Sequence, residues 1–107
     1  MSRGPALHWL VFSLSEGSDG VLGLEAEAAS RDPAEAAAIA AEAAGVLAWA
    51  AEAFPEGPGP VEDGADWDQA LSQHEEPGGW QHLALSLSAS PRFLDAFAAR
   101  FGDPRAD

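Results

Sequence analysis

The residues best suited to chemistry in this sequence are two histidines on either side of a glycine-rich turn. His74 and His82 flank Pro77-Gly78-Gly79. If this turn is the loop of a β-hairpin, counting outward from it pairs Glu76 with Trp80 and His74 with His82. Directly opposed side chains on a sheet lie ~5 Å apart at Cβ, so the two imidazoles could share a ligand.

With Glu76 or Glu25 nearby, the pair would supply two histidines and one carboxylate, a ligand set that divalent metals accept. The spacing matches no specific motif such as HExxH, and opposed histidines on a sheet are most often solvated side chains. The chain contains no cysteine, which excludes thiolate ligands, cysteine nucleophiles and disulfides. We therefore predict no cofactor, and His74 and His82 remain the candidates for a metal.

Nucleophilic catalysis has less support than metal binding. The serines alternate with apolar residues along the stretches that we expect to be strands, and none lies in a G-x-S-x-G motif. Paired carboxylates occur throughout so acidic a chain, and no single pair indicates acid-base chemistry. The sequence therefore favours a non-enzymatic protein.

The charge of the chain limits the partners that it can bind. Aspartate and glutamate number 18 against 5 basic residues, and the formal net charge is −13 at pH 7. Such a surface repels phosphate backbones and anionic lipids, so we expect no nucleic acid and no membrane partner. We expect no segment to be long enough to span a membrane. A basic protein or a second copy of the chain fits better, and the lack of cysteine is compatible with a cytoplasmic location.

The longest predicted element is a helix over residues 32–54. Asp32 can cap it, Pro33 suits the first helical position, Glu35 completes a capping-box pattern and Pro55 follows the end. One stripe of this helix is apolar: Ile39, Ala43, Val46, Leu47, Ala50 and Phe54.

The remaining elements are read from alternation and from turn residues. Residues 6–15, 21–29 and 80–89 alternate as strands do, and residues 17–20 form a turn between the first two. Residues 67–76 have helical composition, but their place before Pro77-Gly78-Gly79 favours a strand. A second helix is predicted after Ser90, from Pro91 to Gly102.

Together these elements predict one α+β domain over residues 1–107, in the order ββαββα. The fold class is a two-layer sandwich, in which a four-stranded antiparallel sheet carries both helices on one face. The two halves, 6–54 and 67–102, are joined by an acidic Pro/Gly linker over 55–66, and a tail follows over 103–107. The inward positions predict this core: Leu10, Phe12, Leu14, Leu22, Leu24, Ile39, Val46, Leu47, Leu83, Leu85, Leu87, Leu94, Phe97 and Phe101.

The second face of this sheet has no predicted element left to cover it. Alternation places Trp9, Val11, Trp80 and His82 there, with Glu25 beside them. Two tryptophans on an uncovered face indicate an interface, so we predict an interaction module that forms a homodimer or binds a basic protein. In the other reading, the acidic linker folds over the tryptophans, or the tryptophans lie at sheet edges. The alternative function is a small-molecule-binding or metal-assisted enzyme domain with a His/Glu site on this face.

Overall fold

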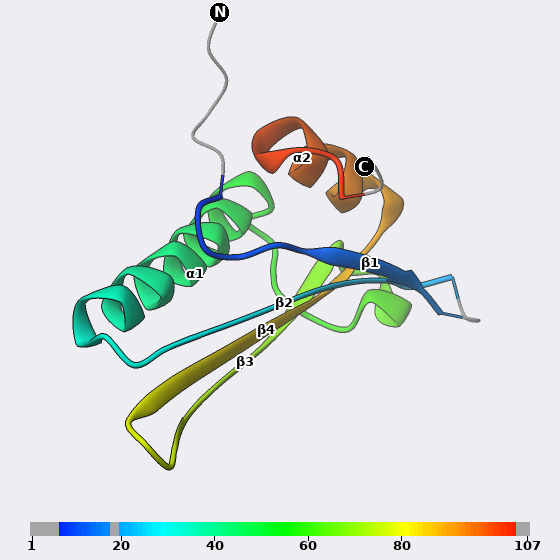
Figure 1. Cartoon of the computed structure of the whole chain (residues 1–107). Coiled ribbons are helices and arrows are strands. Elements are labelled where there is room, and N and C mark those ends of the chain that lie inside the picture. Colours follow the sequence, from blue (N-terminus) through cyan, green and yellow to red (C-terminus); the bar gives the residue numbers. More distant parts are fainter. Residues whose placement is uncertain (1–6, 18–19, 105–107) are drawn as a thin grey trace, which may run out of the picture.

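The computed structural model describes residues 7–17 and 20–104 of the 107-residue chain. The predicted ββαββα order and the two-layer α+β fold are confirmed, with both helices on the same side of the sheet (Figure 1). The elements in chain order are β1 (Ser13–Glu16), β2 (Leu22–Ser30), α1 (Pro33–Ala53), the 3-10 turn η1 (Val61–Asp63), β3 (Trp67–Glu76), β4 (Trp80–Ala89) and α2 (Pro91–Phe101).

The sheet is antiparallel with strand order β1-β2-β4-β3, so β2 and β4 are central and β1 and β3 are edges. Residues 67–76 form a strand, as their place before the turn predicts. It pairs with β4 along its whole length, from Trp67 opposite Ala89 to Glu76 opposite Trp80. Gly78 has a φ of 91°, a left-handed conformation that glycine adopts without strain, and this allows the chain to reverse tightly.

The predicted first strand over residues 6–15 is wrong over residues 7–12, because β1 begins only at Ser13; residue 6 lies outside the described residues. The backbone N–H groups of His8, Trp9 and Leu10 donate to the carboxylate of Glu42 on α1, at 2.7, 2.9 and 2.7 Å. Successive N–H groups of a strand point in opposite directions, so three that meet one carboxylate require a turn. This segment is therefore held against α1 and does not pair with the sheet.

Helix α1 begins as its sequence predicts, with one change in the capping bonds. Asp32 Oδ1 accepts a hydrogen bond from the N–H of Ala34 at 2.9 Å. Glu35 does not return to the backbone of Asp32. It accepts a hydrogen bond from the hydroxyl of Ser30 at 2.8 Å, and Ser30 Oγ accepts the N–H of Asp32 at 3.0 Å. Ser30 thus replaces the backbone contact of a capping box and joins the end of β2 to α1.

With its 21 residues, α1 is long and apolar enough to cross a membrane by length and composition alone, which corrects the expectation that no segment reaches that length. The core helix of a soluble protein and a signal sequence pass the same test, and 22% of the tested window of α1 is buried. Here Ile39, Ala43, Val46 and Ala50 are buried in the core of the domain.

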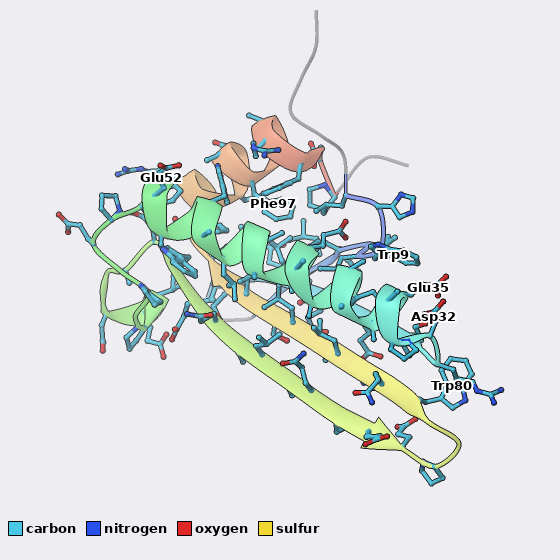
Figure 2. The ribbon with its side chains drawn as sticks, turned by 90° about the vertical axis from the view of Figure 1, so that its left-hand side faces the viewer. Trp9, Asp32, Glu35, Glu52, Trp80 and Phe97 are labelled. Atoms are coloured by element: carbon cyan, nitrogen blue, oxygen red, sulfur yellow. The ribbon has the colours of Figure 1, made fainter. Side chains whose placement is uncertain are left out.

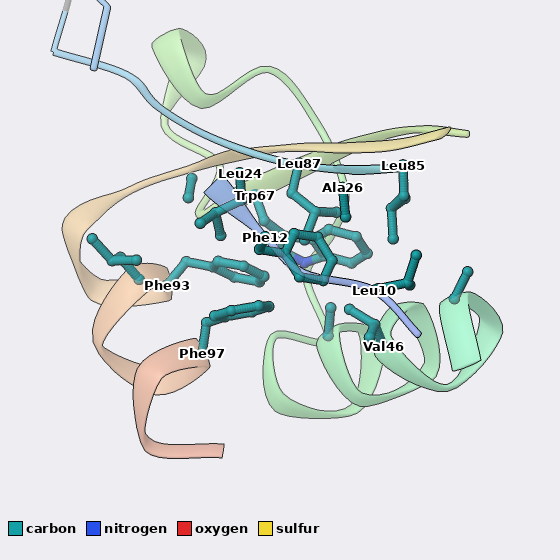
Figure 3. Close-up of a cluster of buried hydrophobic side chains, with 14 of the residues drawn as sticks. Leu10, Phe12, Leu24, Ala26, Val46, Trp67, Leu85, Leu87, Phe93 and Phe97 are labelled. Carbon is teal, nitrogen blue, oxygen red and sulfur yellow. The ribbon is translucent and has the colours of Figure 1, made fainter. Parts of the chain in front are cut away.

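The core lies between the sheet and the two helices (Figure 3). Most predicted core residues are buried, whereas four are only partly buried: Leu14, Leu22, Leu47 and Phe101. The prediction omitted Trp67 and Phe93, which are 1% and 0% exposed. Their rings stack with centroids 5.8 Å apart, so the first residue of β3 and the first turn of α2 close the same end of the core.

Replacing Ser90 by alanine should lower the free energy of unfolding by ~1–2 kcal/mol. Ser90 Oγ accepts the N–H of Phe93 at 3.1 Å and donates to Asp66 Oδ1 at 2.8 Å, so it caps α2 and holds the end of the linker. Urea unfolding measures the loss. Ser88→Ala makes the same chemical change two residues earlier and should shift the midpoint little; equal losses in both variants would contradict the capping role.

Candidate functional site

The sheet face that points away from the helices is the candidate site, and we call it the open face. Leu83, Leu85 and Leu87 of β4 are buried on the helix side, so the residues between them belong to the open face. The pairing of the strands then assigns the other members: Ser13 and Ser15 of β1, Gly23, Glu25, Glu27 and Ala29 of β2, Asp68, Ala70, Ser72, His74 and Glu76 of β3, and Trp80, His82, Ala84, Ser86 and Ser88 of β4.

The residues of the open face are mostly small, so its largest side chains stand out. Serine, alanine and glycine occupy most positions, whereas Glu25 and Glu27 are exposed on β2. Each has a small residue opposite it on β4, Ser86 for Glu25 and Ala84 for Glu27. The middle of this face therefore has few bulky side chains and carries negative charge.

The predicted pairing of His74 with His82 is present. They are direct partners across β3 and β4, and their ring centroids lie 4.7 Å apart. His74 Nε2 lies 3.0 Å from Glu76 Oε2, and His82 Nε2 lies 3.4 Å from Glu27 Oε1. Each imidazole thus has a carboxylate of its own.

The pairing of His74 with His82 does not create a metal site. Within residues 7–17 and 20–104, no group of three or more His, Asp and Glu side chains is arranged to hold a metal ion. His82 Nδ1 is buried and has no hydrogen-bond partner in that part of the chain, so His82 offers only Nε2 to the surface. Glu27 is the carboxylate beside His82, in place of the expected Glu25.

Trp80 lies on the open face, at its outer end beside the β3–β4 turn (Figure 2). Its side chain is 41% exposed, and the guanidinium of Arg31 lies 5.8 Å from the centre of its ring. Arg31 follows the last residue of β2, which pairs with Gln81 beside Trp80. The aromatic ring is therefore partly shielded by a cation from the same chain.

Trp9 does not share this face, which corrects the expectation of two tryptophans there. It packs against the core on the helix side and lines a hollow of about 370 Å³ with Ala41 and Gly45 of α1 and with Phe101 of α2. Because the backbone N–H groups of residues 8–10 bond to Glu42 instead of a neighbouring strand, the alternation that placed Trp9 outward does not apply. A dimer anchored on both tryptophans has no basis in this geometry.

Val11 and the linker also lie elsewhere. Val11 is 83% exposed but precedes β1 and borders a hollow beside Phe101 and Pro104. In the linker, Gly59 donates its N–H to the carbonyl of Trp67 at 3.0 Å, at the start of β3. Trp80 is at the other end of the hairpin, ~30 Å away by strand geometry, so the reading in which the linker covers both tryptophans fails.

Sequence reasoning missed Glu27 and Glu42. Glu27 alternates outward on β2 like Glu25, but only the pairing of β2 with β4 shows which of them lies beside His82. Glu42 carries no signal in the sequence, because its partners are backbone groups 32 to 34 residues away. Comparisons of this chain with protein-family models, with curated proteins and with solved structures find no match.

Proposed function

We propose that this chain is a non-enzymatic interaction module whose open face binds a basic partner protein. One observation supports the proposal above the others. Glu25 and Glu27 stand exposed in the middle of a surface of small side chains, with Trp80 at its outer end. Such a surface admits a flat partner and offers it two carboxylates and an aromatic ring.

The charges favour a basic partner on physical grounds. A formal net charge of −13 attracts cations over a distance and accelerates their encounter with the protein. Arg31 lies 5.8 Å from the centre of the Trp80 ring, and a partner's arginine that displaces it would gain the same cation–π contact. A partner with several basic side chains could reach the ring and the carboxylates of the same face, which lie opposite positions four and six residues along β4 from Trp80.

An NMR titration with a short oligo-arginine peptide tests the proposal. We expect amide shifts to concentrate on β2 and β4 around Glu25, Glu27 and Trp80. The double variant Glu25→Gln/Glu27→Gln should weaken binding about ten-fold, which corresponds to ~1.4 kcal/mol.

The matched control is Glu62→Gln/Asp63→Gln, which removes two charges from the turn η1 in the linker. It should leave the affinity within about two-fold, since screening limits distant charges. Equal weakening by both double variants, or shifts confined to residues 55–66, would mean that the peptide responds only to net charge.

The alternative function, a small-molecule-binding or metal-assisted enzyme domain, has one observation in its favour. His74 and His82 stand ring to ring on the open face, 4.7 Å apart. Their Nε2 atoms face two different carboxylates, Glu76 and Glu27. The exposed acidic surface therefore supports partner binding better than it supports catalysis.

A further inference from the structure

We propose that the free edge of β3 pairs with β3 of a second copy of this chain, antiparallel, with Leu71 opposite the partner's Leu71. The two sheets would then join into one sheet of eight strands. This inference is independent of the proposed function, because it uses the edge of the sheet and not its open face.

The edge is long, and it is free over most of its length: near its start, the carbonyl of Trp67 accepts the N–H of Gly59, and Asp68 Oδ1 accepts the N–H of Gln69. In the order β1-β2-β4-β3, strand β3 has ten residues and pairs only with β4 in the described part of the chain. Alternate backbone N–H and C=O groups of an edge strand point outward and can bond to another strand. Residues 69–76 are all exposed, and Figure 2 shows β3 along the lower margin of the molecule.

Of the devices that usually block edge pairing, β3 carries only charged side chains, Asp68, Glu75 and Glu76. The stretch WDQALSQHEE contains no proline, glycine or lysine. Its pairing with β4 runs without interruption from Trp67 to Glu76, so no bulge twists the edge away. The acidic residues at its far end, Glu75 and Glu76, leave the middle of the strand without charge.

Leu71 gives the edge an apolar centre. It pairs with Leu85, which is fully buried, yet Leu71 itself is 44% exposed. Helix α1 packs over β2 and β4 instead of over β3. Opposite the partner's Leu71, this side chain would lose much of its contact with water, and Gln69 would face the partner's Gln73 on either side of it.

The same register is complementary on the open face. Ala70 faces the partner's Ser72, two small residues that let the strands approach. Asp68 faces the partner's His74, and two-fold symmetry makes this contact twice, so opposite charges meet when the imidazole is protonated. Over residues 68–74, this alignment matches apolar, amide and charged positions at once; beyond the start of β3 it places Glu76 opposite the partner's Asp66, a pair of like charges at each end.

Neighbouring alignments match less well. If Ser72 faced the partner's Ser72, Asp68 would face the partner's Glu76 twice, and like charges opposite each other destabilise a sheet. Leu71 would then face the partner's Gln73. If Ala70 faced the partner's Ala70, Leu71 would face the partner's Gln69 and the pairing would be shorter.

Pairing in this way also enlarges the open face. A two-fold axis perpendicular to the sheet keeps the helices of both copies on one side, so the two open faces form one continuous surface. Glu75 and Glu76, at the turn end of β3, lie at the margins of the new seam. There, salt screens the repulsion between their carboxylates and the acidic residues of the partner.

Cysteine cross-linking tests the pairing and its register, and the chain has no native cysteine to interfere. Residues directly opposite in antiparallel strands have Cα atoms about 4.5–5.5 Å apart, which a disulfide can bridge. Under mild oxidation, Leu71→Cys should form a covalent dimer at least ten-fold faster than Ser72→Cys or Ala70→Cys. Equal rates for the three variants, or a faster Ser72→Cys, would overturn the register.

Sedimentation of the intact chain tests the dimer itself. The unmodified protein should be dimeric at high micromolar concentration, and Leu71→Lys should weaken the association at least ten-fold by placing two ammonium groups opposite each other. Val11→Lys makes the same change at another exposed apolar residue, 83% exposed, and should leave the dimer intact. A monomeric unmodified protein, or equal effects of both substitutions, would refute the proposal.

Discussion

Replacing Phe93 by alanine is expected to lower the free energy of unfolding by ~3–5 kcal/mol, the largest effect of any substitution considered for this chain. The side chain is fully buried and its ring contacts four others, with centroids 5.1 Å from Phe54, 5.5 Å from Trp49, 5.8 Å from Trp67 and 6.5 Å from Phe97. Removing it leaves a cavity among rings held by α1, α2 and β3, which cannot all close on it.

Urea unfolding, followed by circular dichroism, measures this loss. Phe101→Ala is the matched control, because Phe101 lies in the last turn of the same helix and is only partly buried. It should cost less than half as much, since less apolar surface returns to water. Equal losses in the two variants would show that the aromatic cluster around Phe93 does not close the core.

Replacing Glu42 by alanine is expected to release residues 7–12 and to lower the free energy of unfolding by ~2–3 kcal/mol. The carboxylate accepts three N–H groups, from His8, Trp9 and Leu10. Without it, three donors lose a charged acceptor at once, and the burial of Leu10 and Phe12 loses its anchor.

Amide hydrogen exchange measures the release directly. In Glu42→Ala, the amides of residues 8–10 should exchange much faster than in the unmodified protein. Glu52→Ala makes the same change on an exposed residue of α1, with the same gain in helix propensity, and should leave these amides protected. If protection persists in Glu42→Ala, the segment is held by its apolar side chains alone.

Together these variants separate two ways of holding a segment of the chain against a helix. Phe93 joins the end of the linker to α2 by apolar packing, whereas Glu42 joins the first described residues to α1 by charged hydrogen bonds. The first should affect the whole domain, because two-state unfolding spreads a core defect to every element. The second should affect exchange most strongly in residues 7–12, beyond the general increase that the loss of global stability brings.

Local signals in the sequence were sufficient for most of the secondary structure. Asp32 and Pro33 start α1, Ser90 and Pro91 start α2, and Pro77-Gly78-Gly79 reverses the chain, because capping and turn formation depend on residues within one turn of each other. Counting from that loop also predicted the pairing of His74 with His82. Phe93 lies four residues before Phe97, so its burial was within reach of helical periodicity.

Only the tertiary structure decided which surface each aromatic residue occupies. Trp9 lies in a stretch that alternates like a strand. However, the backbone N–H of Trp9 donates to the carboxylate of Glu42 on α1, and the ring lies on the helix side of the sheet. Trp67 begins a stretch whose composition suits both helix and strand, and it is buried because β3 pairs it with Ala89 beside Phe93.

The sequence by itself determined the elements, their order and the acidic character of the domain. The tertiary structure decided that Trp80 stands alone at the end of the open face, that Glu27 lies beside His82 and that β3 is a free edge. The physical reason is range. Caps, turns and alternation depend on neighbours in the chain. Strand order and the partner of a carboxylate depend on residues tens of positions away, and only the packing of the whole core selects among the possible pairings.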